Sequence, residues 1–420
     1  MKEVISVIGG AGHVGLPLCL VLADCSYQVY GIDIDDAKNK IVMSGKLPFV
    51  EEQGEEYLRR ALEKRKLTMT SDASKIKESD IVIIVLGTPT DENLNPRISA
   101  LTEMINSNKH FLRKGQLIIL RSTVTPGTTE IIKRLIEKDQ SHVVGRDIFL
   151  VYAPERVFQG KAIKEIKTLP QLIGAFDDRS YELAEGFFST FLTDKCLRMT
   201  PVEAEIGKLV TNMARYVEFA VANEFYLIAE QFGVNIHRII DACSYNYPRL
   251  KIPVPGPNVG GPCLYKDGWF LLERLPFNGI ISTAFRINEG MTMQIVLKLQ
   301  QFAHIRKVAI LGLTYKAGSD DIRNSLSFKL KKQLEHTHEL VLLDPYLEGY
   351  KDMERIRGSD AIVLMTPHKE FNDLKTIMDL VANDECLYVD IWGFWERMKY
   401  KSRNGYFWGK EARLEYPGLR

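Results

Sequence analysis

The chain has 420 residues, of which 45% are hydrophobic, and its formal net charge is +1 at pH 7. This length predicts two to four domains, and the apolar content is enough to build their cores. Because a charge so near zero gives no electrostatic field for nucleic acid or an acidic membrane surface, we expect neither as a partner.

The amino-terminal segment MKEVISVIGG leads directly into an apolar strand, so we expect no export signal. No run of about 18 uninterrupted apolar residues indicates a membrane span. The six cysteines are scattered, without a CxxC pair or a dense framework. We therefore expect the reducing cytoplasm, where a thiol stays reduced.

Short apolar runs rich in β-branched residues alternate with helical spacing over roughly the first 195 residues. They cover residues 4–8, 29–32, 81–86, 117–120, 148–152 and 172–173. Strands that are buried on both faces need such runs, and their alternation with helices is typical of a parallel, doubly wound sheet.

From Pro201 to Gly233 apolar residues recur every three or four positions, which predicts one helix of about nine turns. A loop rich in proline and glycine follows over residues 245–263, and helical spacing continues to about residue 304. At Lys307 the strand pattern restarts. The predicted fold is α/β, with two Rossmann-like doubly wound parallel-sheet domains joined by a long central helix and a helical region.

The segment VIGGAGHVGLPL carries Gly10, Gly12 and Gly15 in GxGxxG spacing directly after a strand. Glycines permit a tight turn and close backbone approach, and the next helix offers its first N–H groups to a pyrophosphate. Asp33 ends the next strand, where its carboxylate can accept hydrogen bonds from a ribose and disfavours the extra phosphate of NADP. The motif predicts NAD as the cofactor.

Other polar residues have both a functional and a structural interpretation. Lys208 and Asn212 share a face of the long helix. This face is either exposed to solvent or carries groups that stabilise an oxyanion. Glu155 follows a strand at the edge where doubly wound sheets bind ligands, or it is a capping carboxylate. Thr88 and Thr123 end two other strands and can equally begin a turn or cap a helix.

Cys263 lies behind residues 260–262, Gly-Gly-Pro, in what we expect to be an irregular loop. A lone cysteine is more often a buried small side chain than a nucleophile. Here Lys266 and Asp267 follow within one turn, and a thiolate needs positive charge nearby. Lys208 and a helix predicted to start near Lys266 could supply it. The other five cysteines are interpreted as structural.

Lys316 and Arg323 lie between a strand and a helix, a position that suits contact with phosphates, although solvated charges are the alternative. Asp320 and Asp321 can order this loop. No cluster of His, Cys and Asp has the spacing of metal ligands, so we expect no metal.

Together these segments resemble the UDP-sugar 6-dehydrogenases of the UDP-glucose/GDP-mannose dehydrogenase family, over essentially the whole chain. The family's motifs occur in order: GxGxxG, STV with a glycine turn, PE, KxxxN, GGxCxxKD and the segment KAGSDDIRNS. The resemblance implies an NAD-binding domain over residues 1–197, a central dimerisation domain over 198–304 and a UDP-binding domain over 305–420. It also implies a homodimer.

The resemblance also implies roles for single residues. The implied catalytic residues are the nucleophile Cys263, then Lys208, Asn212 and Asp267 for oxyanion and water, the acid/base Glu155, and Thr123 for water. Those implied to bind the cofactor are Gly10, Gly12, His13, Val14, Gly15, Asp33, Lys38, Thr88 and Thr123. Those implied to bind the substrate are Glu155, Arg156, Lys208, Asn212, Arg249, Gly260, Lys316 and Arg323.

The expected reaction is the four-electron oxidation of the C6 alcohol of a UDP-sugar to a uronic acid, through a thiohemiacetal and a thioester on Cys263. The segments PERVFQGKAI and PGPNVGGPC favour a UDP-N-acetylhexosamine, such as UDP-N-acetylmannosamine or UDP-N-acetylglucosamine. Pro262 replaces the histidine of that branch and YKD keeps a lysine typical of the glucose enzymes, so UDP-glucose stays an alternative. Two further hypotheses for the function are a two-electron hydroxyacid dehydrogenase and a non-catalytic NAD sensor.

Overall fold

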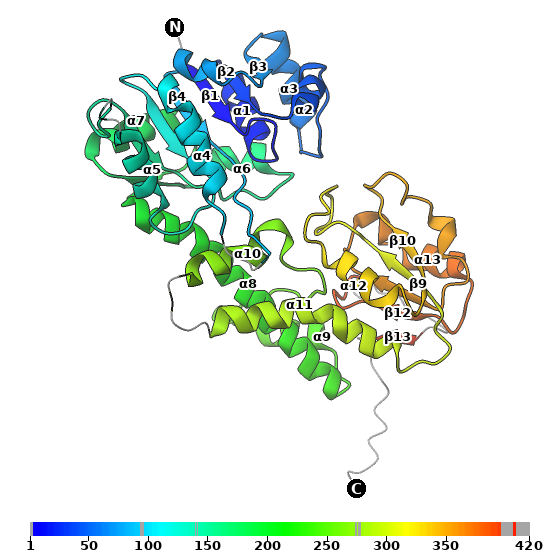
Figure 1. The fold of residues 1–420 in the computed structure, drawn as a ribbon. Coiled ribbons are helices and arrows are strands. Elements are labelled where there is room, and N and C mark those ends of the chain that lie inside the picture. Colours follow the sequence, from blue (N-terminus) through cyan, green and yellow to red (C-terminus); the bar gives the residue numbers. More distant parts are fainter. Residues whose placement is uncertain are drawn as a thin grey trace. The chain divides into compact units, whose positions relative to one another are not determined.

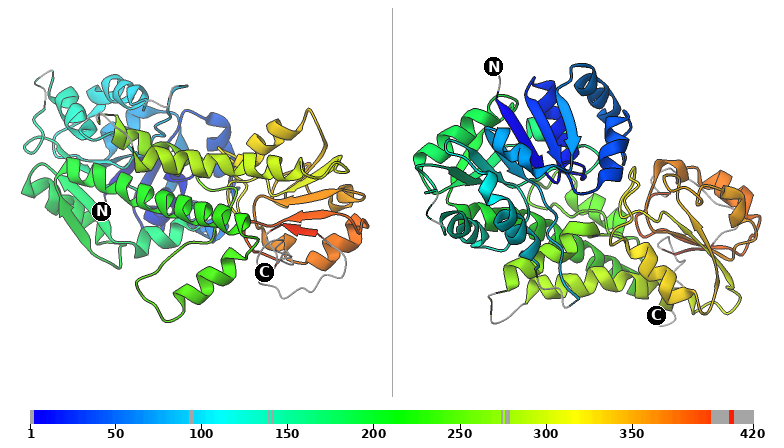
Figure 2. Two further views of the ribbon diagram at one scale, coloured as in Figure 1. Left: turned by 90° about the horizontal axis from the view of Figure 1, so that it is seen from below. Right: turned by 45° about the horizontal axis from the view of Figure 1, so that its top comes forward.

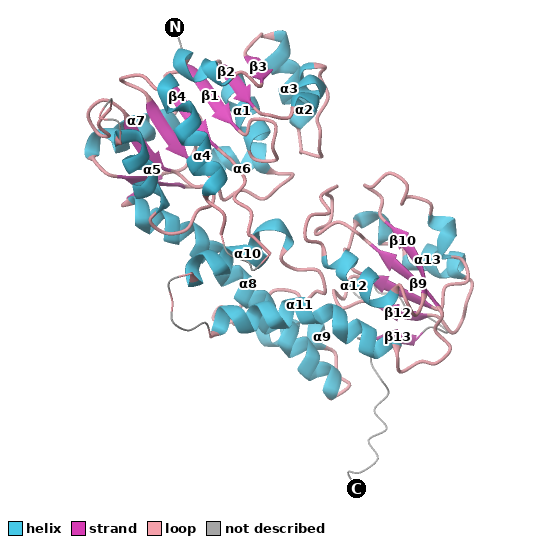
Figure 3. Cartoon of the chain, viewed as in Figure 1, coloured by secondary structure: helices cyan, strands magenta, loops and turns pink. Residues whose placement is uncertain are grey.

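The structure, a computed structural model, describes residues 3–92, 96–138, 140, 142–273, 275, 279–395 and 406–408. The chain forms two compact units. One contains Met1–Thr211 and Trp269–Pro276, and the other contains Asn212–Gly268 and Phe277–Arg420. Each unit is built around one sheet with helices packed on it (Figures 1 and 3). The predicted division into three domains, with boundaries after residues 197 and 304, stays a prediction.

The sheet of the first unit has the strand order β3-β2-β1-β4-β5-β6-β7-β8. Its strands are β1 Val4–Ile8, β2 Gln28–Ile32, β3 Leu67–Thr70, β4 Ile81–Ile84, β5 Leu117–Leu120, β6 Phe149–Tyr152, β7 Gln171–Ala175 and β8 Cys196–Met199. The two edge strands, β3 and β8, were not expected from the sequence. Both are partly exposed, so neither needs the continuous apolar run by which a central strand is recognised.

The first sheet is parallel from β3 through β6, as predicted. The prediction is wrong for β7, which pairs antiparallel with β6, and β8 follows the direction of β7. A buried apolar run looks the same in either direction, so its sequence does not reveal which way the strand runs. As a consequence, β7 begins at the carboxyl end of β6.

Two hydrophobic cores cover the two faces of this sheet. In β4 and β5 successive residues alternate between them: Ile81 and Ile83 face one core, and Val82 and Ile84 face the other. The first core is closed by α1 Gly15–Asp24, α2 Asp36–Met43, α3 Gly54–Glu63, α6 Ala162–Thr168 and α7 Asp178–Phe188. The second is closed by η1 Ala73–Glu78, α4 Ser99–Asn108, η2 Lys109–Phe111 and α5 Thr128–Glu137.

The long helix predicted from Pro201 is present as α8 Pro201–Gln231, and Gly233 with a φ of 62° follows its end. After it come α9 Ile236–Ser244, α10 Gly261–Leu272 and α11 Ile280–Leu299. Helices α8 and α11 lie side by side (Figure 2), joined where the buried Asn288 accepts a hydrogen bond from Asn223 at 2.9 Å. None of the described helices is both long and apolar enough to cross a lipid bilayer.

The sheet of the second unit has the order β10-β9-β11-β12-β13 and is parallel throughout, as predicted. Its strands are β9 Lys307–Leu311, β10 Glu339–Leu343, β11 Ala361–Leu364, β12 Leu387–Val389 and β13 Tyr406–Trp408. Its other elements are α12 Leu326–Leu334, η3 Met353–Ile356, η4 Lys369–Phe371 and α13 Leu374–Val381. The fold class expected from the sequence is therefore confirmed.

Candidate active site

A glycine turn joins β1 to α1. A Cβ atom on Gly15 would lie 2.1 Å from the carbonyl oxygen of Gly9, and one on Gly10 would lie 2.6 Å from the Cα of Gly31. Neither position tolerates a side chain, because the opposing atoms are backbone. Gly12 differs, since the nearest atom to its Cβ position is 3.4 Å away. A side chain at Gly12 would instead fill the space that a pyrophosphate needs against the backbone.

Asp33 follows β2 and reaches this turn. Its carboxylate accepts hydrogen bonds from the backbone N–H of Ala11 at 3.0 Å and of Asp35 at 3.1 Å. The predicted acid and the predicted glycine turn are thus adjacent, as a dinucleotide site requires. Lys38 lies in the first turn of α2, where its ammonium pairs with Asp35 at 3.1 Å.

His13 and Val14 complete the turn. Val14 is the residue before α1, and the ring of His13 packs on that of Phe49 with centroids 4.1 Å apart. His13 Nδ1 also lies 2.9 Å from Nε2 of Gln159. Phe49 and Gln159 were not predicted, because no spacing in the sequence connects them with the glycine turn.

The ends of β4 and β5 bring Thr88 and Thr123 together. Thr88 is buried, and its hydroxyl donates a hydrogen bond to the carbonyl oxygen of Thr123. The two threonines therefore connect neighbouring strand ends at the carboxyl edge of the sheet, which is the edge where folds of this kind bind ligands.

Glu155 follows β6 at the same edge and forms a buried ion pair with Arg121, which follows β5. Its other oxygen accepts hydrogen bonds from the backbone N–H groups of Arg156 at 2.7 Å and Val157 at 2.9 Å. Burial acts to raise the pKa of Glu155, but the charge of Arg121 and these hydrogen bonds together hold it below its usual value. Glu155 is consequently a carboxylate at neutral pH.

Sequence reasoning missed Arg121, although it directly precedes the STV motif. Its side chain is only 3% exposed, and its second guanidinium nitrogen donates to the amide oxygen of Gln171 at 3.0 Å. Gln171 is the first residue of β7, so the antiparallel strand supplies the third member of this network. The guanidinium of Arg156 donates to the carbonyl oxygen of Pro170.

Lys208 and Asn212 lie one turn apart on α8, and each is only 8% exposed. They are therefore not on a solvated face. One turn before Lys208, the fully buried Glu205 accepts hydrogen bonds from the backbone N–H of Gly127 at 2.6 Å and of Thr129 at 2.7 Å. This contact fastens α8 to the beginning of α5.

In the second unit Asn212 meets Asp267. The side-chain amide of Asn212 donates to Asp267 at 2.6 Å, and the ammonium of Lys266 lies 3.3 Å from the other carboxylate oxygen. Asp267 is fully buried on α10, one turn after Cys263. The structure thus brings Asn212, Asp267 and the α10 turn that bears Cys263 into one place.

Cys263 lies in the first turn of α10, so the expected loop position and the expected helix start near Lys266 are wrong. Gly261 has a φ of 54°, which glycine adopts readily, and Pro262 fits the first turn of the helix because it has no N–H group to leave unsatisfied. The exposed Cys263 therefore lies at the amino-terminal end of a helix, whose partial positive charge favours a thiolate.

Arg323 lies within electrostatic range of Cys263. The pKa of Arg323 is raised, mainly by its hydrogen bonds to Asp321 and in smaller part by the charge of Cys263. Tyr315 fills the space beside Gly261, where a Cβ would lie 2.3 Å from the ring, and the ammonium of Lys316 is 5.7 Å from the centroid of that ring.

Two other predicted positions lie in the segment between α9 and α10. The guanidinium of Arg249 stacks 4.9 Å from the centroid of the Tyr247 ring, and Gly260 has a φ of 129° immediately before α10. The described residues contain no group of three or more His, Cys, Asp or Glu side chains that could hold a metal ion.

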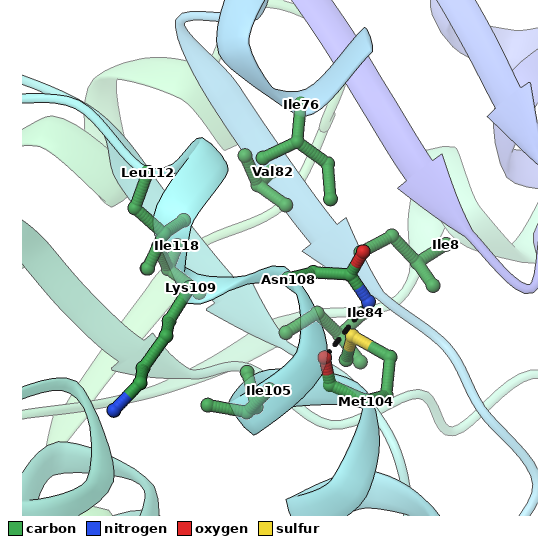
Figure 4. A pocket seen from close by; sticks show the side chains of 10 residues that line it. All are labelled: Ile8, Ile76, Val82, Ile84, Met104, Ile105, Asn108, Lys109, Leu112 and Ile118. Atoms are coloured by element: carbon green, nitrogen blue, oxygen red, sulfur yellow. Dashed lines mark hydrogen bonds between the residues drawn. The ribbon is translucent and has the colours of Figure 1, made fainter. Parts of the chain in front are cut away.

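A small pocket in the first unit lies elsewhere, between α4 and the sheet (Figure 4). Its walls are mainly apolar, and its volume of about 10 Å³ is enough for about one water molecule. Its lining residues are Ile8, Ile76, Val82, Ile84, Met104, Ile105, Asn108, Lys109, Leu112 and Ile118. None of them belongs to the predicted site, so we interpret the pocket as a packing gap.

A glycine turn and an acid at the ends of the first two strands of a doubly wound sheet define a dinucleotide-binding protein. Comparison with known protein families identifies the family to which the chain belongs. The chain matches the NAD binding domain of the UDP-glucose/GDP-mannose dehydrogenase family over residues 3–192, its central domain over 202–289 and its UDP binding domain over 309–397. The chain belongs to this family, as its motifs indicate, and it is an NAD-dependent UDP-sugar dehydrogenase.

Relatives with similar sequences include UDP-N-acetyl-D-mannosamine dehydrogenases of two organisms. The Pyrococcus horikoshii protein is 35% identical over 376 residues, 87% of this chain and 90% of the relative. That of Methanocaldococcus jannaschii is 33% identical over 390 residues, 89% of each chain.

Two solved structures are similar over nearly the whole chain. The UDP-D-ManNAc dehydrogenase of Pyrococcus horikoshii has a TM-score of 0.88 at 32% identity, covering 97% of this chain and 99% of that one. The UDP-N-acetyl-mannosamine dehydrogenase Cap5O of Staphylococcus aureus has a TM-score of 0.85 at 28% identity, covering 96% and 98%.

Proposed function

We propose that this dehydrogenase oxidises the C6 alcohol of a UDP-N-acetylhexosamine, with UDP-N-acetylmannosamine as the preferred substrate, to the corresponding uronic acid. The names of its relatives and the segments PERVFQGKAI and PGPNVGGPC favour this sugar over UDP-glucose. The observation that carries the chemistry is the exposed Cys263 in the first turn of α10, one turn before the buried pair of Asp267 and Asn212.

Gly10, Gly12, Gly15 and Asp33 would hold the cofactor, with His13, Val14, Lys38, Thr88 and Thr123 around them. When bound, NAD accepts the hydride that each oxidation step releases. Because the conversion of an alcohol to a carboxylate removes four electrons, two NAD molecules are needed for each substrate. A group of the protein must therefore retain the aldehyde between the two steps.

Cys263 is that group in our proposal. Its thiolate forms a C–S bond with the aldehyde carbon, and the carbonyl electron pair becomes the oxyanion of a thiohemiacetal. Loss of the second hydride converts this adduct into a thioester. Lys208 and Asn212 would stabilise the oxyanions, since an ammonium and an amide N–H both donate hydrogen bonds to negative oxygen.

Water then breaks the C–S bond and releases the acid and the thiolate. Glu155 would accept the proton of the attacking water, which Thr123 would orient and Asp267 would help to order. The ionised state that Arg121 imposes on Glu155 supports the role of base in this step. On the substrate side, Lys316, Arg323 and Arg249 would bind the diphosphate, and Gly260 would let the backbone approach it. Arg156 would contribute a further contact to the substrate.

We also propose that the protein forms a homodimer, and the surface of α8 supports this proposal. Large apolar side chains are exposed along this helix at intervals of three or four residues, interrupted around its middle. They are Val202, Ile206, Val210, Val221, Phe225 and Ile228, and the exposed Phe232 follows directly after the helix. An apolar stripe of this length on one helix is typical of a surface that a partner covers.

We further propose that the enzyme works in the cytoplasm, where its product supplies the synthesis of a surface polysaccharide. All six cysteines lie within the described residues and none forms a disulfide, which is compatible with a reducing compartment. UDP-sugars are also the activated donors from which polysaccharides are built.

The test is a panel of UDP-N-acetylmannosamine, UDP-N-acetylglucosamine and UDP-glucose with NAD, read by NADH formation and by the mass of the product. We expect two NADH for each UDP-N-acetylmannosamine, and a product that has gained one oxygen and lost two hydrogens. Cys263→Ser should abolish formation of the acid, whereas the matched variant Cys243→Ser, at another exposed thiol, should not. A Cys263→Ser enzyme that still makes two NADH at the normal rate would contradict the covalent mechanism.

A further inference from the structure

Asn258 lies in the loop before α10 and is only 3% exposed. Its amide nitrogen is surrounded by oxygen atoms from three segments of the second unit. These are the Thr314 carbonyl at 3.0 Å and the hydroxyls of Thr366 at 2.9 Å, Ser325 at 3.1 Å and Ser327 at 3.3 Å. Its amide oxygen accepts the backbone N–H of Leu326 at 2.8 Å. A single side chain thus satisfies polar groups of several elements.

These partners meet at one position of the second sheet. Thr314 follows β9, Thr366 follows β11, and Leu326 is the first residue of α12. The strand order β10-β9-β11 reverses between β9 and β11, and such a switch point is where doubly wound sheets normally bind a ligand against a helix N-terminus. In this chain the amide of Asn258 occupies that position as an internal ligand.

The same loop is fixed at Gly256. Its backbone N–H donates at 2.8 Å to Asn223, a fully buried residue of α8. On the other side Gly256 packs on the indole of Trp392, where a Cβ would lie 2.2 Å from the ring. The loop is therefore held by a hydrogen bond and by close packing two residues before Asn258.

Between Asn258 and Cys263 the chain passes through Gly260 and Gly261, with φ values of 129° and 54°. Glycines in such conformations are permissive, so they do not by themselves define where α10 begins. Tyr315, which packs at Gly261, belongs to the same connection between β9 and α12 that binds Asn258. The loop and the start of α10 thus both pack against one segment, residues 312–327.

We propose that Asn258 is a positioning residue for Cys263. By binding at the switch point of the second sheet, its amide fixes the beginning of α10 and hence the position of the thiol. The importance of this for catalysis rests on the proposed function of Cys263, but the position of the thiol can be tested without turnover.

The experiment uses the full chain and measures how fast iodoacetamide alkylates Cys263, by peptide mass spectrometry. Cys243, exposed on α9, is the reference thiol in the same molecule. In Asn258→Ala we expect the ratio of the two rates to change several-fold, because the thiol leaves its place at the helix N-terminus. We also expect kcat for acid formation to fall about 10- to 100-fold, as a displacement of about 1 Å does, while KM for NAD stays unchanged.

A matched pair at Thr366 tests the same contact with less disturbance. Thr366→Val removes the hydroxyl that accepts from Asn258 and should reproduce the change in the alkylation ratio, whereas Thr366→Ser keeps the hydroxyl and should restore the wild-type ratio. The control is Asn383→Ala, because Asn383 donates to the carbonyl of Ser359 at 3.2 Å near the start of β11, at the opposite edge of the same sheet. This variant should leave the alkylation ratio and kcat unchanged.

The proposal is overturned if folded Asn258→Ala or Thr366→Val loses thermal stability but keeps the wild-type alkylation ratio and kcat, since Asn258 would then be only structural. If the wild-type enzyme oxidises no UDP-sugar, the proposed function fails. The alkylation ratio is independent of that result and still decides whether Asn258 positions the thiol.

Discussion

The thiols of this chain differ in their surroundings. Burial raises the pKa of Cys196 to about 11 and that of Cys386 to about 12, so both stay protonated and inert at neutral pH. Cys263 is instead exposed at the beginning of a helix. The sequence singles it out through the GGxCxxKD motif, but the helix start beside it follows from the packing of Tyr315 against Gly261.

Arg121→Gln should move the acid limb of the pH profile of kcat/KM to higher pH. Arg121 and the backbone N–H groups of Arg156 and Val157 together oppose the effect of burial on Glu155, so without Arg121 the pKa of this carboxyl should rise. The enzyme would then lose its base as pH falls through a higher value. A tenfold change in the acid dissociation constant of this carboxyl corresponds to a free-energy difference of about 1.4 kcal/mol between its two protonation states.

The same variant should be less stable, since removing one partner of a buried pair costs about 3–5 kcal/mol. In the wild type the folded-state pKa of Glu155 lies below its usual value. The carboxylate therefore contributes stability at pH values above the usual one, and this is lost as pH falls through the folded-state pKa. Arg179→Gln, at an exposed pair with Glu182, is the control. An unmoved acid limb in a folded Arg121→Gln enzyme would exclude Glu155 as the base.

At the level of single elements, Gly15 and Gly12 of the glycine turn are expected to have different roles, one in stability and the other in NAD binding. Gly15→Ala should lower the melting temperature, because its Cβ would lie 2.1 Å from a backbone oxygen. Gly12→Ala should fold normally, since its nearest atom is 3.4 Å away, but should weaken NAD binding about 10-fold or more by filling the space for the pyrophosphate. Calorimetry of unfolding and of NAD binding separates the two effects.

Gly186→Ala is the control for the glycine variants, because no atom lies within 4 Å of its Cβ position on α7. It should leave NAD binding unchanged and stabilise the helix by up to about 1 kcal/mol. Normal stability in Gly15→Ala would show that the turn is less tightly packed than the contact distances indicate.

The helix α8 can be tested as an interface in a similar way. Phe225→Glu places a charge among the exposed apolar residues in the carboxyl-terminal half of α8, and burying an unpaired charge is costly, so the proposed dimer should dissociate. Sedimentation velocity at several concentrations measures this. Lys332→Glu, exposed on α12, should not change the oligomeric state. A Phe225→Glu protein that sediments like the wild type would rule out this stripe as the interface.

At the level of the whole molecule, the two units should respond to different ligands. A ligand that binds only the folded state at about 100 times its Kd stabilises that state by about 2.7 kcal/mol. We expect NAD and UDP each to raise the melting temperature. Lys316→Ala should lose the increase caused by UDP and keep that caused by NAD, and Gly12→Ala should show the reverse. Loss of both increases in one variant would show that the two sites are not independent.

The sequence by itself determined the fold class, the long helix α8, the family and the cofactor, because periodicity, glycine spacing and motif order are local properties of the chain. These signals need only neighbours along the chain, which is why β1 and β4 to β6 were recognised while the partly exposed edge strands β3 and β8 were not.

Only the tertiary structure decided the direction of β7, the helical position of Cys263 and the contacts of residues distant in sequence. Arg121 contacts Glu155 because β5 and β6 are parallel neighbours, and it contacts Gln171 because β7 is antiparallel. Asn258 contacts Thr314 and Thr366 because two strand ends converge on its loop. Such contacts join residues tens of positions apart, and their energies depend on burial and distance, which a sequence pattern does not contain.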